Sequence, residues 1–291
     1  MHDSQTRRTL LRGVGHVAAS GALAAALPRL APAAEPGDAA ICLSMFYPNT
    51  ATASFDADAW ASRHLPLLRG IYGDSVERIE LRMFVPPPPA PPAAPAQPKR
   101  RPSGEGLSRA PSMPMPMPRP SAAAQPLLRA AVSVWIYEAK AFAERATAGA
   151  QQIASDIATI TPLVPTVQYD RIVNLLGEPR SSIAVGTQVV SNFYRNADGG
   201  RFDADYYSTN VIPLMVKLYG AKTISRIEFG MGARGDGGGA PSLRAAAHYY
   251  IKDPAAWAAA NAAAEGSLRA EVSRFTDGTP LISSMRVAAA G

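Results

Sequence analysis

The sequence predicts an α+β protein in which two copies of one small domain follow each other in a single chain. The tetrapeptide Phe-Asp-Ala-Asp at 55–58 returns at 202–205, a spacing of 147, and Arg-Ile-Glu at 78–80 returns at 226–228, a spacing of 148. Later matches, at a spacing of 115, are Phe142 with Trp257, Asp156 with Glu271, and Pro165 with Pro280. Solenoid repeats are about 20–50 residues long, so a period of this length indicates two whole domains.

The first domain, which we place at residues 39–176 and call the first unit, has the element order of a ferredoxin-like βαββαβ fold. Asp56 can cap the N-terminus of a helix, and Gly73 can end the same helix. Between them, apolar side chains recur every three or four residues, as on one face of a helix. The expected elements are a strand at 41–46, a helix at 56–73, strands at 76–85 and 130–137, a helix at 140–157 and a strand at 168–173.

The second domain, at residues 185–291 and called the second unit, repeats this order in a degenerate form. The expected elements are a strand at 189–194, a helix at 203–219, strands at 225–231 and 243–251, a helix at 254–273 and a strand at 281–287. In each unit the helices cover one face of the sheet, so a second sheet is needed to bury the other face. We therefore expect the two sheets to close as an intramolecular α+β barrel with an internal pseudo-twofold axis, which makes the chain a monomer.

A single insertion accounts for the change of spacing between the units. Residues 86–126 are rich in proline, which fixes φ and removes backbone donors, so we expect a disordered segment. We interpret it as a tolerated surface loop, and the alternative is a proline tract that binds a partner. At the same place in the second unit, Gly-Met-Gly-Ala-Arg-Gly at 230–235 spells a dinucleotide fingerprint, but no helix begins after it. We expect a hairpin loop there.

Residues 1–34 are typical of an export signal. The segment 6–12 contains the paired Arg7 and Arg8 of a twin-arginine motif, a stretch of small apolar residues follows, and Ala-Pro-Ala at 31–33 is a cleavage site. The stretch is too short for a membrane-spanning helix. We therefore expect a bacterial protein that the twin-arginine machinery exports folded, to the periplasm or outside the cell, with no membrane span after the signal is removed. The alternative is a disordered basic tail.

The charge pattern excludes nucleic acid as a partner of the folded part. The net charge is +6, but residues 1–33 and 86–126 hold the excess of basic residues. The remainder is near neutral and lacks the basic surface that nucleic acid requires. The chain has 1 Cys and 4 His. These are too few ligands for a zinc site, so we expect no metal.

Candidate chemistry centres on one histidine in the first helix. His64 stands two residues before Pro66, and the second unit keeps the proline as Pro213 but has Val211 where the histidine would be. Four features occur together in the first unit: the Phe-Tyr-Pro strand end at 46–48, the Phe-Asp-Ala-Asp helix start, His-x-Pro-Leu at 64–67, and the segment from Asp156 to Pro165. In these features the chain resembles the EthD-like family of dimeric α+β barrel proteins. The resemblance implies the barrel fold and a link to oxidative degradation.

His64 is the candidate catalytic residue, because a neutral imidazole can accept or donate a proton near pH 7. The alternative is a buried histidine bonded to backbone, and we expect such a structural role for His248. Tyr47, Trp60 and Tyr194 are the candidate substrate-binding residues, because aromatic rings suit an apolar or aromatic ligand with one polar handle. Ordinary core packing is the alternative for each ring.

We expect an exported protein that binds or transforms a small apolar organic molecule. The resemblance implies an oxidoreductase or a cofactor-light monooxygenase, while the residues leave open whether the protein is an enzyme. The alternative is a non-catalytic carrier or interaction protein. A third hypothesis is haem binding, since this fold occurs in exported haem peroxidases, although the Gly-x-x-Asp-Gly motif of the dye-decolorising type is absent. No cofactor is evident, and haem and flavin both stay open.

Overall fold

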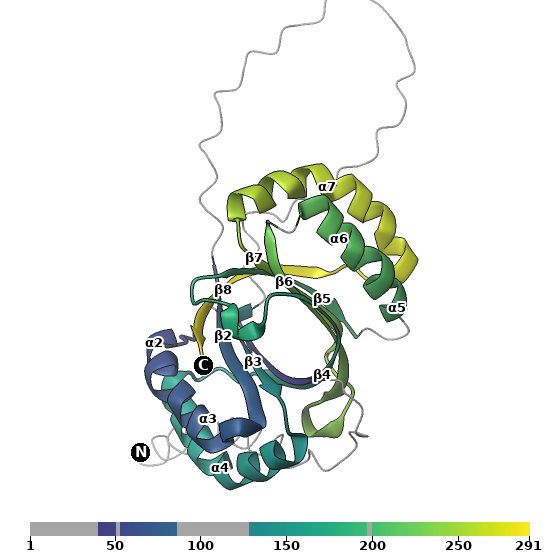
Figure 1. The fold of residues 1–291 in the computed structure, drawn as a ribbon. Coiled ribbons are helices and arrows are strands. Elements are labelled where there is room, and N and C mark those ends of the chain that lie inside the picture. Colours follow the sequence, from purple (N-terminus) through teal and green to yellow (C-terminus); the bar gives the residue numbers. More distant parts are fainter. Residues whose placement is uncertain (1–39, 51–52, 86–127, 197–199, 221) are drawn as a thin grey trace, which may run out of the picture. The chain divides into compact units, whose positions relative to one another are not determined.

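The computed structural model describes residues 40–50, 53–85, 128–196, 200–220 and 222–291. Their strands form one closed barrel in the order β1-β3-β2-β8-β5-β7-β6-β4 (Figure 1). This confirms the expected α+β barrel of two βαββαβ units. The expected export signal at 1–34 and the insertion at 86–126 lie outside the described residues.

The first unit follows the expected order and begins its helical segment at the expected cap. Asp56 Oδ1 accepts a hydrogen bond from the backbone N–H of Ala59, at 2.9 Å. The elements are β1 (Ile41–Pro48), α2 (Ala57–Ala59), α3 (Leu65–Tyr72), β2 (Val76–Phe84), β3 (Leu128–Ile136), α4 (Ala139–Ile160) and β4 (Thr166–Gly177).

The second unit repeats both the order and the cap. Asp203 Oδ1 accepts from the backbone N–H of Tyr206, at 2.8 Å. The elements are β5 (Gln188–Arg195), α5 (Ala204–Tyr206), α6 (Ile212–Tyr219), β6 (Ile224–Gly235), β7 (Leu243–Ile251), α7 (Pro254–Phe275) and β8 (Leu281–Ala290). The helices of each unit lie on the outside of the barrel, against their own strands (Figure 1).

The barrel closes where strands of different units pair. β2 pairs antiparallel with β8, and β4 pairs antiparallel with β6. β4 is longer than the sequence predicts because its last residues, Asn174 to Gly177, pair with Phe229 to Arg226 of β6. The end of β4 therefore joins the sheet of the first unit to a strand of the second unit.

The prediction of a loop at the glycine-rich segment 230–235 is wrong. These residues complete β6, and Gly232 and Gly235 are paired with β4. A Cβ atom on Gly232 would lie 2.1 Å from the carbonyl oxygen of Leu243, and one on Gly235 would lie 2.2 Å from that of Ala240. The two glycines therefore allow close backbone approach within the sheet, which is an ordinary use of glycine in strands.

The repeated Arg-Ile-Glu segments place charged side chains inside the barrel. Glu80 and Glu228 are both buried, and Arg82 is 0% exposed. Arg78 Nε donates to Glu80 Oε2 at 3.3 Å, and Arg226 Nε donates to Glu228 Oε1 at 2.6 Å. Each unit thus contributes a buried ion pair to the interior, while the apolar cores lie between the strands and the helices.

Candidate functional site

His64 ends a π-helical turn, Trp60–His64, that connects α2 to α3. Pro66 is the second residue of α3 and lies inside a continuous helical segment, directly after the π-turn in which the backbone N–H of Leu65 donates to the carbonyl of Trp60. The second unit has the same turn at Tyr207–Val211, before Pro213. π-Turns are frequent at functional sites, but this one occurs in both units and therefore belongs to the fold.

The imidazole of His64 is bonded to Asp156 on α4. His64 Nδ1 lies 2.7 Å from Asp156 Oδ2, and the side chains are 4% and 16% exposed. Arg63 Nε donates to the other carboxylate oxygen, Oδ1, at 2.7 Å. One carboxylate therefore orients the imidazole with one oxygen and holds a guanidinium group with the other.

Burial lowers the pKa of His64, and this effect outweighs the hydrogen bond and the charge of Asp156, which raise the pKa. The nearby charge of Arg63 lowers the pKa further. The imidazole is therefore neutral near pH 7. Because an ionised carboxylate only accepts hydrogen bonds, the Nδ1–H group faces Asp156 and the lone pair lies on Nε2. This tautomer can act as a base at Nε2.

The second unit keeps the acidic residue but not the base. Glu271 corresponds to Asp156, and Val211 corresponds to His64. The Tyr206 hydroxyl donates to Glu271 Oε2 at 2.6 Å, and Arg274 Nη1 lies 3.5 Å from Glu271 Oε1. In the second unit, the carboxylate of Glu271 therefore contacts a tyrosine and an arginine, whereas the equivalent carboxylate of the first unit, Asp156, contacts a histidine and an arginine.

Asp156 is a site residue that the sequence reasoning missed. Its match with Glu271 shows that an acidic residue recurs at this place in both units. Nothing local to either residue indicates which side chain it binds, since His64 is 92 residues away from Asp156. The repeat therefore indicates the acidic position, but only the packing of the two helices shows which side chain the carboxylate binds.

The structure brings one of the candidate aromatic residues to His64. The Trp60 and His64 ring centroids are 5.9 Å apart. Tyr47, on β1, lies in the same apolar core, where its ring meets Phe55 edge-on at 5.0 Å. Tyr194, on β5, belongs to the core of the second unit. The four predicted residues therefore do not form a single constellation.

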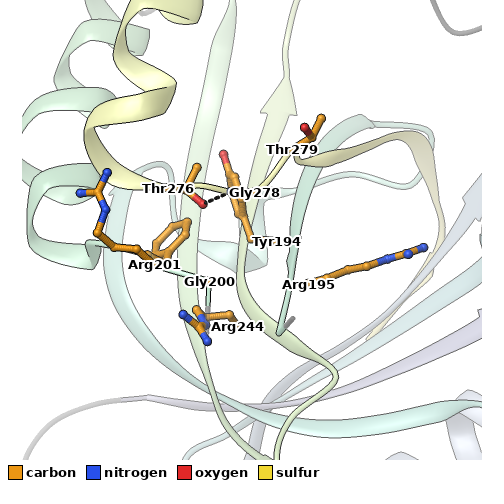
Figure 2. A pocket seen from close by; sticks show the side chains of 9 residues that line it. Tyr194, Arg195, Gly200, Arg201, Arg244, Thr276, Gly278 and Thr279 are labelled. Atoms are coloured by element: carbon orange, nitrogen blue, oxygen red, sulfur yellow. Dashed lines mark hydrogen bonds between the residues drawn. The ribbon is translucent and has the colours of Figure 1, made fainter. Parts of the chain in front are cut away.

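A pocket of about 200 Å³ lies in the second unit (Figure 2). Its lining includes the aromatic rings of Tyr194 and Phe202 and the side chains of Arg195, Arg201 and Arg244. In Figure 2, Arg195 and Arg201 lie on opposite sides of Tyr194. This pocket is not lined by His64, so the histidine and the pocket are separate features.

His248 lies on β7 with its side chain in the barrel interior. Its Nδ1 is 2.9 Å from Ser191 Oγ, and its ring meets Phe193 edge-on at 5.8 Å. Burial lowers the pKa of His248 well below its usual value, and the charge of Arg82 adds to this effect. A neutral, partly buried imidazole that is held by a serine hydroxyl fits the structural role that the sequence suggests.

Within the described ranges, no group of three or more His, Cys, Asp or Glu side chains is placed to hold a metal ion. No helix in the same part of the chain is long and apolar enough to cross a membrane.

No protein-family model matches the chain, and no curated protein matches it. Among solved structures, an EthD-like protein from Ralstonia eutropha JMP134 is 20% identical, with a TM-score of 0.33, and the match covers 35% of this chain and 91% of that one. An anthrone oxidase-like protein is 11% identical (TM-score 0.47), with coverage of 88% and 94%. Chlorite dismutase from Candidatus Nitrospira defluvii, in complex with imidazole, is 10% identical (TM-score 0.38), with coverage of 87% and 93%. At these identities the likeness concerns the α+β barrel fold alone.

Proposed function

We propose that the first unit binds and transforms a small apolar or aromatic organic molecule, with His64 as its acid–base group. The observation that carries this proposal is the bond between His64 Nδ1 and Asp156 Oδ2, at 2.7 Å. It holds a buried imidazole in one orientation and one tautomer. The second unit, which has Val211 instead, retains the fold without that arrangement.

The chemistry follows from the tautomer. Nε2 takes a proton from an acidic C–H or O–H group of the substrate, and His64 becomes an imidazolium ion. Asp156 then stabilises the new positive charge through the Nδ1–H bond, as a carboxylate does in a catalytic triad. A positioned general base contributes about 10²–10⁴-fold to a rate. Trp60 and Tyr47 supply the apolar surroundings.

The class of reaction and the location of the protein are proposed on the sequence alone. The resemblance to EthD-like proteins supports an oxidoreductase or cofactor-light monooxygenase, and Arg7 and Arg8 support export through the twin-arginine machinery to the periplasm or outside the cell. The proton transfer at His64 needs neither haem nor flavin. The pocket in Figure 2 has a volume of about 200 Å³, which is below the range of about 300–1,000 Å³ that ligand pockets usually have, so no cofactor is placed in it.

A non-catalytic carrier is the second candidate, and the pocket lined by Tyr194 is the observation that favours it. A carrier requires a cavity and apolar walls but no base. Under this alternative, replacing His64 would leave ligand binding unchanged.

His64→Val tests the proposal because it copies the residue that the second unit uses at this position. We expect the variant to fold and to lose turnover or binding of neutral aromatic probes such as phenol, a naphthol and acetophenone. Thermal melting measures the first property, and calorimetry or product analysis measures the second. Val211→His is the matched control and should add no activity, because Tyr206 and Arg274 already bind Glu271.

The opposite pattern would assign His64 to the core. A variant that melts several degrees lower, yet binds and converts the probes as the parent does, contradicts a catalytic role. The absorbance spectrum of the purified parent adds an independent check, since bound haem or flavin would absorb in the visible range.

A further inference from the structure

The two units contain the same corner, at the place where the second helix runs into the last strand. In the first unit, Leu163 N donates to Thr161 Oγ1 at 3.1 Å. In the second unit, Gly278 N donates to Thr276 Oγ1 at 3.0 Å. The backbone of the corner is therefore equivalent in both units, and its side chains can be compared position by position.

The neighbouring aromatic pair is also equivalent. The rings of Tyr47 and Phe55 are 5.0 Å apart in the first unit, and those of Tyr194 and Phe202 are 4.8 Å apart in the second. The same tyrosine–phenylalanine contact thus forms one wall of the corner in each unit.

What differs is the filling of the corner. The first unit has Leu163, which is buried in its apolar core. The second unit has Gly278, and a Cβ atom there would have Thr276 Oγ1 as its nearest neighbour, at 3.6 Å. The pocket of about 200 Å³ opens at this glycine (Figure 2). Loss of one large side chain therefore distinguishes the open corner from the filled one.

The open corner also gains positive charge. Arg195 and Arg201 line it where the first unit has Pro48 and Ser54. Arg201 is paired with Asp277, its Nε lying 3.6 Å from Oδ1. For Arg195, no carboxylate partner is found within the residues that the structure describes.

A third arginine of the pocket is held in a fixed orientation. Arg244 Nε and Nη2 both donate to Asn196 Oδ1, at 3.2 and 3.0 Å. Asn196 is itself tied down, since its Nδ2 donates to the carbonyl of Pro241 at 3.0 Å. Within the described part of the chain, Arg244 Nη1 makes no hydrogen bond, so it can donate to a ligand. Its partner Asn196 is uncharged, so the positive charge of Arg244 is not neutralised there.

We infer that this corner of the second unit is a binding site for a small aromatic or cyclic carboxylate. The carboxylate accepts hydrogen bonds from Arg244, and guanidinium groups suit planar carboxylates. The ring of the ligand packs against Tyr194 and Phe202. The cavity volume limits the ligand to about one ring. The inference does not rest on the function proposed for His64, and it places Tyr194, one of the candidate substrate-binding residues, in a site of the second unit.

Isothermal titration calorimetry on the full-length chain, at low and at physiological salt, tests the inference. Benzoate is the probe, benzamide is its uncharged counterpart, and inorganic phosphate is an anion without a ring. We expect benzoate to bind with a weaker affinity at the higher salt concentration. We expect benzamide and phosphate to bind at least about tenfold more weakly, because each lacks one of the two recognised features.

Gly278→Leu is the matched variant, because it copies Leu163 and should fill the pocket without disturbing the corner. It should abolish benzoate binding while leaving the melting temperature close to that of the parent. Arg244→Gln should weaken benzoate binding at least about tenfold. His64→Val should leave benzoate binding unchanged, which separates this site from the one proposed in the first unit.

Three outcomes would overturn the inference. Benzoate affinity that survives both Gly278→Leu and Arg244→Gln would place binding elsewhere. Equal binding of phosphate and benzoate would show a general attraction of anions to arginine. No measurable benzoate binding by the parent at millimolar concentration would show that the corner is not a site for this class of ligand.

Discussion

Glu228 lies at the centre of a buried charge cluster, so replacing it with leucine should lower the free energy of unfolding substantially. Its Oε1 accepts hydrogen bonds from Arg226 Nε at 2.6 Å and from Arg180 Nε at 2.8 Å. The side chain of Glu228 is 1% exposed, and those of Arg226 and Arg180 are 6% and 3% exposed. The change would leave two guanidinium groups in the barrel interior without this carboxylate.

Breaking a buried ion pair from one side costs about 3–5 kcal/mol, because the remaining charge stays buried. Two contacts reduce this cost, since Arg180 also pairs with Glu77, and Arg226 also donates to the carbonyl of Glu178. We therefore expect a loss of about 3 kcal/mol, at the lower end of the range. For a chain of this size, that loss corresponds to a fall of about 6–12 °C in melting temperature.

Urea denaturation at neutral pH, followed by circular dichroism, measures the loss. Glu265→Leu is the control, because Glu265 forms an exposed pair with Arg269 on α7, at 3.4 Å, and should change stability by less than about 0.5 kcal/mol. Adding Arg226→Met to Glu228→Leu should recover part of the loss by removing one unpaired charge. A loss below about 1 kcal/mol, similar to that of the control, would refute the reasoning and show that water reaches the barrel interior.

Two further predictions concern the pH dependence of stability and the assembly state. Burial lowers the pKa of His248 below the 6.5 of an unfolded chain, so below that pH the unfolded state binds a proton that the native state does not, and stability falls as the pH falls. The variant His248→Ser copies Ser133 of the first unit. Its melting temperature should therefore fall less than that of the parent between about pH 7.5 and pH 5, and an equal fall in the two proteins would contradict this. Because the barrel closes through β2–β8 and β4–β6 within one chain, light scattering should show a monomer; an obligate dimer would count against a self-contained barrel.

The sequence predicts the order of the elements because the signals for them are local. Asp56 and Asp203 cap their helices through hydrogen bonds to backbone three residues away, and the alternating or helical spacing of apolar residues can be seen within one segment. The repeat then predicts the barrel, since a sheet with one bare face needs a partner. The asymmetry between His64 and Val211 also follows from the repeat alone.

Contacts between distant segments were decided only by the tertiary structure. The bond between His64 and Asp156 joins two helices, and the use of 230–235 as strand depends on pairing with β4 in the other unit. The pocket beside Tyr194 depends on the packing around Gly278, a residue that by itself predicts only a turn. The physical reason is the same in each case: a side chain's partners and the space beside it are set by which segments pack together, and local sequence patterns do not specify that packing.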